Sequence, residues 1–131
     1  MTGEELIRSI WERWNAGDRD VDDEIWDPEI EIHSVLAGRV FKGEEGLRAW
    51  VDEIDEQFDR WAISLDEVRE YTPDRFLCDG MIRAHGRLSG VDLDQPASWI
   101  IVLRDGRIRT LRNFIGPAAQ AEAAKEAVTA A

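Results

Sequence analysis

The stretch FLCDGMIRAHGRL, residues 76–88, forms the centre of the sheet that the sequence predicts. Its side chains alternate in the way that is typical of a β-strand, whose successive side chains point to opposite faces. Arg83 and His85 share one face, and Ile82 and Ala84 share the other. An unpaired charge is costly to bury, so the polar pair needs partners or water. We therefore ask what that polar face meets.

Outward from this strand, the hydrophobic period divides the chain into a helical first part and a later part made mainly of strands. Thr2 and Glu5 resemble a capping box at the start of the first helix. We predict helices over 2–17 and 44–61, a short helix within 19–27 that Asp27-Pro28 ends, loops over 36–46 and 89–97, and strands over 29–33, 61–71, 76–88, 98–103 and 108–115.

Helices followed by four hairpin-connected strands favour an α+β fold with helices on one face of an antiparallel sheet. The pair Asp105-Gly106 is a strong hairpin signal. A curved sheet of this kind, closed by an amphipathic helix, leaves a pocket between the layers. No linker or repeat divides the chain, so we expect one domain over 1–131. Its alanine-rich end, 117–131, is predicted to be a docked but fraying helical tail.

Charge and cysteine content exclude several classes of partner. The chain has 131 residues and a net charge of −12, which disfavours nucleic acid and anionic membranes. Its longest apolar run, residues 99–103, is too short to span a bilayer. The N-terminal residues lack the layout of a signal peptide. The single cysteine, Cys78, allows no internal disulfide, which is typical of a cytoplasmic protein.

Two histidines are the natural candidates for proton transfer near neutral pH. His33 ends the first predicted strand on the face of Glu31, and His85 follows Arg83 in the central strand. If both histidines face one cavity, a proton-transfer site results. The alternative is that His33 is hydrogen-bonded at a strand end, Arg83 pairs with a carboxylate, and His85 is exposed.

Other chemistries have little support in the sequence. No HExxH, HxH or CxxC spacing is present, so neither a metal nor a cofactor is predicted. No serine lies in a nucleophile elbow, and the glycines mark turns rather than a phosphate loop. Four of the six tryptophans are predicted to fill the core or to line an apolar pocket, namely Trp11, Trp14, Trp50 and Trp99.

The order of these elements resembles the nuclear-transport-factor-2-like superfamily, and within it the SnoaL-like branch. The resemblance rests on WDPEIEIH at 26–33, GRVFKGEEGLRAWV at 38–51 and RDGRIRTLRNFIGPAAQAEAA at 104–124. Polyketide cyclases, limonene epoxide hydrolase and ketosteroid isomerase are relatives. The resemblance implies a cone-shaped α+β barrel in which a curved sheet wraps around the N-terminal helices and a deep apolar pocket, often as a dimer through the sheet.

The epoxide hydrolase pattern is an Arg-x-Asp pair on the central strand and an Asp on the last strand. Here these positions correspond to Arg83-Ala84-His85 and Asn113, so both aspartates are replaced. The resemblance then implies that Arg83 holds a substrate oxygen, that His85 or His33 carries the proton, and that Asn113 orients the substrate or a water. Three tryptophans would form the pocket walls, namely Trp14, Trp50 and Trp99.

We therefore expect a cofactor-independent pocket protein that isomerises, cyclises, dehydrates or hydrolyses a small apolar metabolite. The alternative is a non-catalytic ligand-binding or assembly module of the same fold. We also predict a homodimer packed through the sheet, because the helices cover only one of its faces. The predicted interface consists of Phe76, Cys78, Ile82, Ala84, Ile100 and Val102. The competing arrangement places the C-terminal helix across that face.

Overall fold

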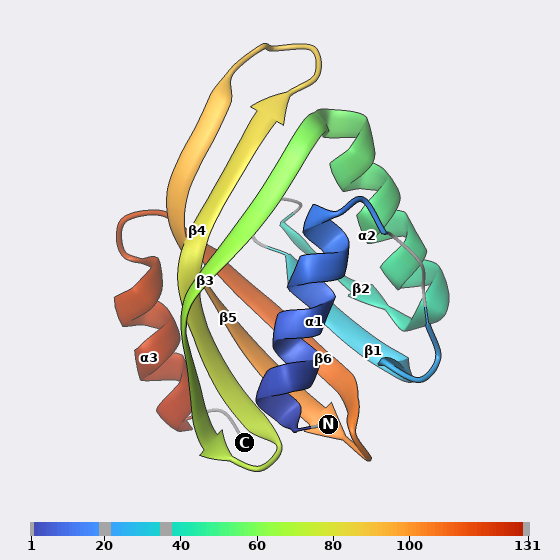
Figure 1. The fold of residues 1–131 in the computed structure, drawn as a ribbon, viewed down its shortest axis with the longest axis vertical. Coiled ribbons are helices and arrows are strands. Elements are labelled where there is room, and N and C mark those ends of the chain that lie inside the picture. The colour runs from blue at the N-terminus through green and yellow to red at the C-terminus, as the bar shows by residue number, and fades with distance from the viewer. Residues whose placement is uncertain (1, 19–21, 35–37, 130–131) are drawn as a thin grey trace.

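The computed structural model describes residues 2–18, 22–34 and 38–129. Within them the chain forms three helices and six strands (Figure 1). The helices are α1 (Gly3–Asn15), α2 (Gly43–Gln57) and α3 (Ala119–Thr129). The strands are β1 (Trp26–Ser34), β2 (Arg39–Lys42), β3 (Phe58–Thr72), β4 (Arg75–Gly86), β5 (Asp92–Arg104) and β6 (Arg107–Ile115).

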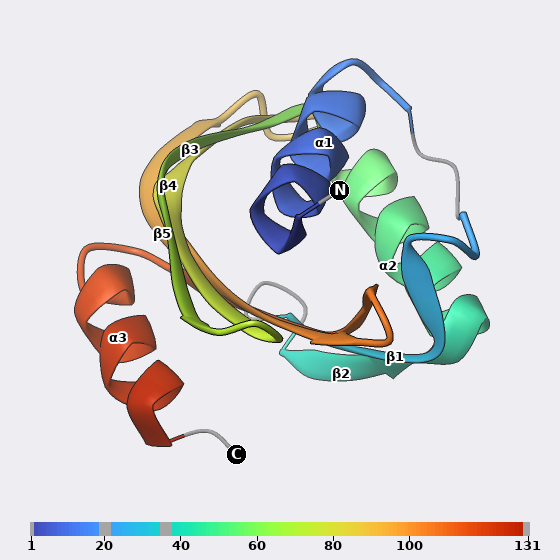
Figure 2. The ribbon, with the colours of Figure 1, turned by 60° about the horizontal axis from the view of Figure 1, so that its bottom comes forward.

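The six strands form one curved sheet in the order β2-β1-β6-β5-β4-β3. The sheet bends around α1 and α2, while α3 lies against its convex side (Figure 2). This arrangement confirms the expected curved α+β fold. One pairing departs from the antiparallel pattern, because β1 runs parallel to β6. This pairing joins strands from opposite ends of the chain, which local alternation cannot reveal.

The concave side of the sheet and the two N-terminal helices enclose the main core. On α1, the side chains of Ile7, Ile10, Trp11 and Trp14 are buried, as their helical spacing predicts. The Thr2 hydroxyl accepts a hydrogen bond from the Glu5 backbone N–H at 3.1 Å, which fixes the start of this helix.

Three local predictions were wrong. The described part of the predicted short helix, residues 22–25, forms a turn, and β1 already begins at Trp26. Pro28 lies where the β1–β6 register is irregular, a position that tolerates a missing backbone donor. The two predicted loops also contain strand residues, because β2 pairs with β1 and the start of β5 pairs with the end of β4, each as a hairpin with the preceding strand.

The hairpin between β5 and β6 is confirmed. Asp105 and Gly106 have φ angles of 54° and 76°, so both residues of the turn are in the left-handed region. A tight hairpin of this type requires that conformation, which Asp-Gly adopts more easily than most pairs.

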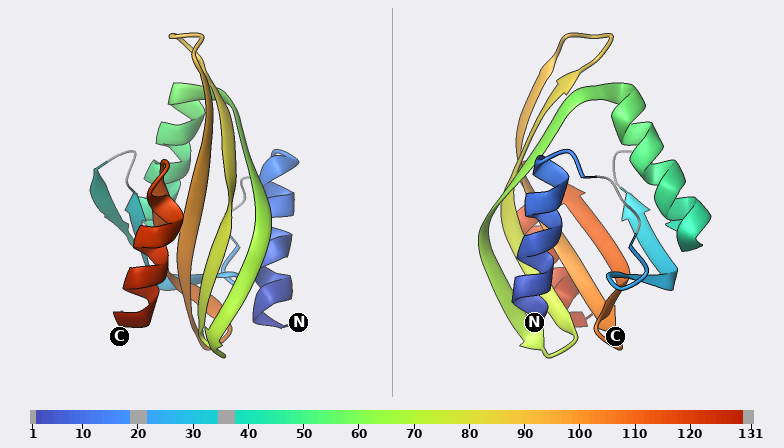
Figure 3. Two further views of the ribbon diagram at one scale, coloured as in Figure 1. Left: turned by 90° about the vertical axis from the view of Figure 1, so that its left-hand side faces the viewer. Right: turned by 45° about the vertical axis from the view of Figure 1, so that its right-hand side comes forward.

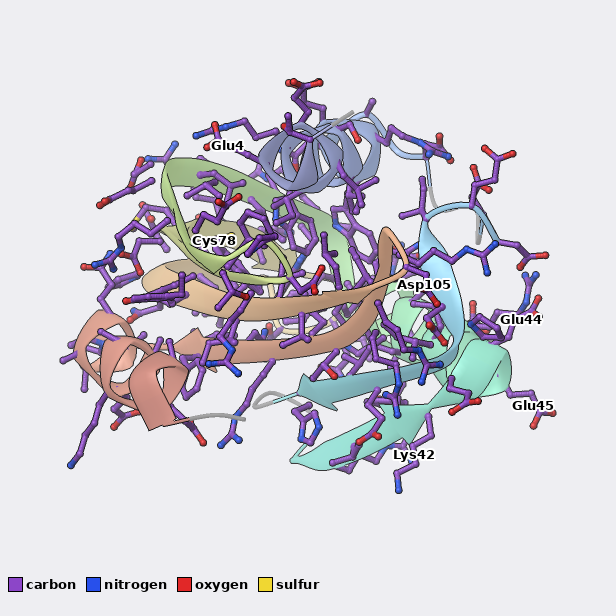
Figure 4. The ribbon with its side chains drawn as sticks, turned by 90° about the horizontal axis from the view of Figure 1, so that it is seen from below. Glu4, Lys42, Glu44, Glu45, Cys78 and Asp105 are labelled. Carbon is purple, nitrogen blue, oxygen red and sulfur yellow. The ribbon has the colours of Figure 1, made fainter. Side chains whose placement is uncertain are left out.

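The structure reverses the predicted faces of β4. Phe76, Cys78, Ile82 and Ala84 belong to the main core beneath α1, so they cannot form an exposed interface. Figure 4 shows Cys78 among the side chains of the interior. On the opposite side of the sheet, α3 packs over a second cluster formed by Leu77, Ile100, Phe114, Ala119, Ala123 and Ala127 (Figure 3). The competing arrangement, with the C-terminal helix across the free face, is therefore the observed one.

Candidate functional site

Arg83 and His85 lie on the convex face of the sheet. Their neighbours Ile82 and Ala84 point into the main core, so alternation turns the polar pair outward. The Arg83 side chain is 66% exposed and lies 3.6 Å from Asp94 of β5. His85 Nδ1 lies 2.8 Å from Asp59 Oδ1. The two side chains therefore have carboxylate partners on neighbouring strands.

His33 occupies the end of β1, where it is paired in register with Val40 of β2 and Arg112 of β6. Its side chain is about one-third exposed, and its Nε2 lies 3.6 Å from Glu31 Oε1. The other oxygen of that carboxylate accepts a hydrogen bond from Arg109 at 3.2 Å. A carboxylate held in this way favours one orientation of the imidazole.

Asn113 is buried on β6, directly opposite Trp99 of β5. It follows Leu111 of the main core by two residues on the same strand, so its side chain is also on the concave side of the sheet. It is therefore separated from Arg83 by the sheet itself and by the intervening strand β5. The structure therefore does not bring Arg83, His85 and Asn113 together, although the sequence had predicted this grouping.

Instead, Asn113 and His33 line one hollow of about 270 Å³. It lies where β1 ends at Ser34 while β6 continues to Ile115. We call this space the β1-end hollow, and its lining residues are His33, Ser34, Gly38, Arg39, Val40, Arg112, Asn113 and Phe114. Neighbouring residues of one strand point to opposite faces of the sheet. Because Arg112, Asn113 and Phe114 all line the hollow, it lies at the end of β1 and is not confined to one face of the sheet.

Two arginines of the hollow are held by aromatic rings and carboxylates. The Arg39 guanidinium lies 4.3 Å from the centre of the Phe41 ring and pairs with Glu53 of α2. The Arg112 guanidinium lies 5.4 Å from the centre of the Phe114 ring and 2.7 Å from Glu126 of α3. Neither arginine was a candidate from the sequence: Arg112 is next to Asn113 in the stretch at 104–124, and Arg39 lies in the stretch at 38–51.

Residues 7–111 match the family of SnoaL-like domains. The chain belongs to this family. No curated protein sequence matches this SnoaL-like chain significantly.

Solved structures share the fold of this SnoaL-like chain at low sequence identity. A SnoaL-like polyketide cyclase, so named, from a Jannaschia species is 23% identical, with a TM-score of 0.73 over 98% of this chain and 92% of its own. A protein with a ketosteroid isomerase-like fold from Catenulispora acidiphila, in complex with trimethylamine, is 11% identical, with a TM-score of 0.77 over 91% and 90%. TerC, co-crystallised with polyporic acid, is 16% identical, with a TM-score of 0.75 over 94% and 98%.

The tryptophans of this SnoaL-like chain fill the space between α1, α2 and the sheet. Trp14 and Trp50 have ring centres 5.5 Å apart, and Trp11 and Trp99 have ring centres 5.6 Å apart. All four are buried. They therefore form part of the core, which was the first of the two interpretations of these residues.

A second hollow of about 200 Å³ lies between α1 and β3, and Trp11, Asn15 and Ile63 contribute to its lining. Within the described residues, Trp11 Nε1 is buried without a hydrogen-bond partner. The Asn15 amide donates to the Ile63 carbonyl at 2.6 Å and accepts from the Ile63 N–H at 2.9 Å. The Asn15 amide thus hydrogen-bonds to backbone groups of β3 that would otherwise lack partners, because β3 is an edge strand of the sheet.

Two further observations concern metals and membranes. Across residues 2–18, 22–34 and 38–129, no group of three or more His, Cys, Asp or Glu side chains is placed to hold a metal ion. Among the helices of the same described residues, none is long and apolar enough to cross a membrane.

Proposed function

We propose that this SnoaL-like chain binds a small, largely apolar metabolite at the β1-end hollow and that His33 exchanges a proton with it. The observation that carries the proposal is that His33 and Asn113, both candidates from the sequence, line the same hollow. Its volume of about 270 Å³ is just below the usual range of ligand pockets, roughly 300–1,000 Å³. Val40 and Phe114 supply apolar surface for the ligand.

The hollow supports acid–base chemistry that needs no cofactor. An imidazole can give and take a proton near neutral pH, while the Asn113 amide can donate to a carbonyl and accept from a hydroxyl or a water. Isomerisation, cyclisation, dehydration and hydrolysis all need one proton carrier and one group that orients the substrate. Arg83 and His85 have no part in this proposal, because neither belongs to the lining of the hollow.

A non-catalytic ligand-binding module is the second candidate. It is favoured by the lining of the hollow, in which the described residues include one imidazole, that of His33, and no carboxylate. General acid–base enzymes commonly use a second titratable group as a partner. Binding without turnover would agree with this candidate.

The two histidines of the chain provide a matched test. Imidazole ¹⁵N signals, assigned with His33→Gln and His85→Gln, are followed while small apolar carbonyl compounds are added. We expect a ligand to shift the His33 signals and leave those of His85 unchanged. Any turnover should fall roughly 10²–10⁴-fold in His33→Gln and persist in His85→Gln. Turnover that survives His33→Gln would contradict the catalytic role.

Two broader expectations also remain proposals. A homodimer, if formed through the sheet, uses the part of the convex face beside α3, because four of the six residues first expected at the interface lie in the main core and a fifth, Ile100, lies beneath α3. The lone buried thiol of Cys78 is compatible with the reducing cytoplasm, where we propose that the protein acts.

A further inference from the structure

The lining of the β1-end hollow has an unusual charge for this chain. Acidic residues outnumber basic ones by 28 to 16 in the sequence, yet none of the described residues that line the hollow is acidic. Two arginines and a histidine contribute to the hollow from three strands, namely Arg39 from β2, His33 from β1 and Arg112 from β6. The hollow thus gathers N–H donors, although each arginine also pairs with a glutamate outside the lining.

Both guanidinium groups are oriented before any ligand arrives. Arg39 lies over the Phe41 ring and pairs with Glu53, and Arg112 lies near the Phe114 ring and pairs with Glu126. The closest contact of each guanidinium with its carboxylate is made by one terminal nitrogen. An arginine has five N–H donors, so each group keeps donors for a second acceptor.

The partners of these arginines belong to different elements. Glu53 is on α2, inside the curve of the sheet, and Glu126 is on α3, outside it. The two arginines therefore contribute to the lining of the hollow from the two faces of the sheet. Because the side chains are held by rings and carboxylates, little conformational entropy is lost when a ligand binds.

We propose that the β1-end hollow selects ligands that carry a carboxylate or a comparably acidic oxygen, and that Arg39 and Arg112 bind this group. The inference rests on the proposed function of the same hollow and adds the charge of its ligand. The fold itself does not decide that charge, because one structural neighbour was crystallised with a compound named as an acid and another with an amine. The side chains of this chain decide it.

Three probes of one shape test the proposal, namely benzoate, benzamide and benzylamine. Each is titrated into the full chain while the signals of His33 and of the arginine Nε–H groups are recorded. We expect benzoate to shift the signals of His33, Arg39 and Arg112 with a saturable curve, and benzamide to bind at least about tenfold more weakly. Benzylamine should cause no shift, and benzoate binding should weaken as salt is added.

Charge-removing variants complete the experiment. Arg39→Gln and Arg112→Gln should each weaken benzoate binding roughly tenfold, which corresponds to about 1.4 kcal/mol. Arg48→Gln is the matched control, because Arg48 on α2 also has a single carboxylate contact, to Glu44 at 3.0 Å, and lies outside the hollow. Circular dichroism checks that each variant is folded.

The possible results separate this inference from the proposed function. Equal binding of benzoate and benzamide, with shifts at His33, would overturn the anion selectivity and leave the proposed function standing. Arginine-dependent benzoate binding together with turnover that survives His33→Gln would support the anion selectivity and contradict the proposed role of His33. Benzoate binding that ignores both arginine variants, or no benzoate binding at the hollow, would overturn the inference.

Discussion

At the scale of single residues, Asp27 connects the start of β1 to the end of β5. Its side chain is 6% exposed and accepts two hydrogen bonds from the Arg104 guanidinium, at 2.7 and 2.9 Å. The Glu29 backbone N–H donates a third, at 2.8 Å. The contact with Arg104 is the main reason why the pKa of Asp27 is lowered. The folded chain therefore holds this carboxylate in its charged form.

Asp27→Asn should lower the free energy of unfolding at pH 7 by about 1–2 kcal/mol, since it removes charge-assisted hydrogen bonds to a half-exposed arginine. A lowered pKa stabilises the fold above the ordinary Asp pKa, near 4, and this gain is lost as the pH falls through the lowered value. Urea unfolding from pH 7 to pH 2 should show the two proteins converging in acid. Asp23→Asn, at an exposed position, is the control, and a difference independent of pH would contradict this account.

The fold lowers the reactivity of the Cys78 thiol. Burial raises the pKa of its thiol to about 12, so the reactive thiolate is scarce at neutral pH. We expect an aromatic disulfide reagent to label the native chain at pH 8 only as fast as the chain unfolds, and to label it at once in urea. Rapid labelling without denaturant would show that the core around β4 opens locally.

At the scale of elements, α3 is held by small side chains. Ala119, Ala123 and Ala127 pack on Leu77, Ile100 and Phe114, and the sequence predicts a docked helix on this weak apolar face. The packing shows that docking depends on close approach rather than on large side chains, because alanines spaced four apart leave little gap between helix and sheet.

Ala123→Glu should undock α3, because position 123 is fully buried and the new carboxylate would have no partner there. Far-UV circular dichroism should lose the signal of one helix, and binding of a hydrophobic dye should rise as the cluster around Leu77 is exposed. Ala121→Glu, on the exposed side of the same helix, should change neither signal. Equal effects of the two variants would mean that α3 does not depend on this packing.

The β4–β5 hairpin is fastened to the end of α2 by Arg87. Its guanidinium donates to the carbonyls of Asp55 and Phe58, at 2.8 and 3.3 Å, and its backbone N–H donates to the Gln57 carbonyl at 2.8 Å. Arginines near a helix C-terminus satisfy carbonyls that have no partner within the helix. This contact explains one polar side chain of the stretch at 76–88.

Arg87→Met should cost about 1–2 kcal/mol of unfolding free energy, because it leaves these carbonyls without the guanidinium. Arg83→Met should cost less than about 0.5 kcal/mol, since its ion pair is exposed. Chemical denaturation of the two variants compares an arginine that caps a helix with one on an open face. A larger loss for Arg83→Met would contradict the contacts described above.

At the scale of the whole molecule, the curvature of the sheet decides which side chains can form an interface. Ile82 is fully buried on the concave side, whereas its neighbour Met81 is half-buried on the convex side. Ile82→Glu should destabilise the chain by at least about 4 kcal/mol rather than split a dimer. Met81→Glu should be far milder, and chemical denaturation with light scattering compares the two.

The same light-scattering measurement tests the proposed homodimer. We expect twice the chain mass of 15.0 kDa at micromolar concentration. A mass equal to that of one chain would reject association through the convex face. If a dimer is found, Met81→Glu should weaken it, because this residue lies on the side of the sheet that a second copy would meet.

Local patterns were enough to predict α1, α2, the tail helix, the central strands and the turn at Asp105-Gly106. These elements depend on hydrophobic period, capping and turn chemistry, which act over a few residues. The position of His33 at a strand end and the place of Asn113 on the last strand were predicted for the same reason. The sequence by itself therefore determined these elements and the family resemblance, but neither β2 nor the turn at 22–25.

Only the tertiary structure decided which face of each strand is covered. Both faces of β4 carry apolar residues, Leu77 on one and Ile82 on the other, so alternation cannot distinguish the side of α1 from the side of α3. The β1-end hollow likewise depends on the parallel pairing of His33 with Arg112, residues that are distant in sequence. Such pairing is stabilised by contacts that form only when the whole sheet closes around its core, and no local period encodes it.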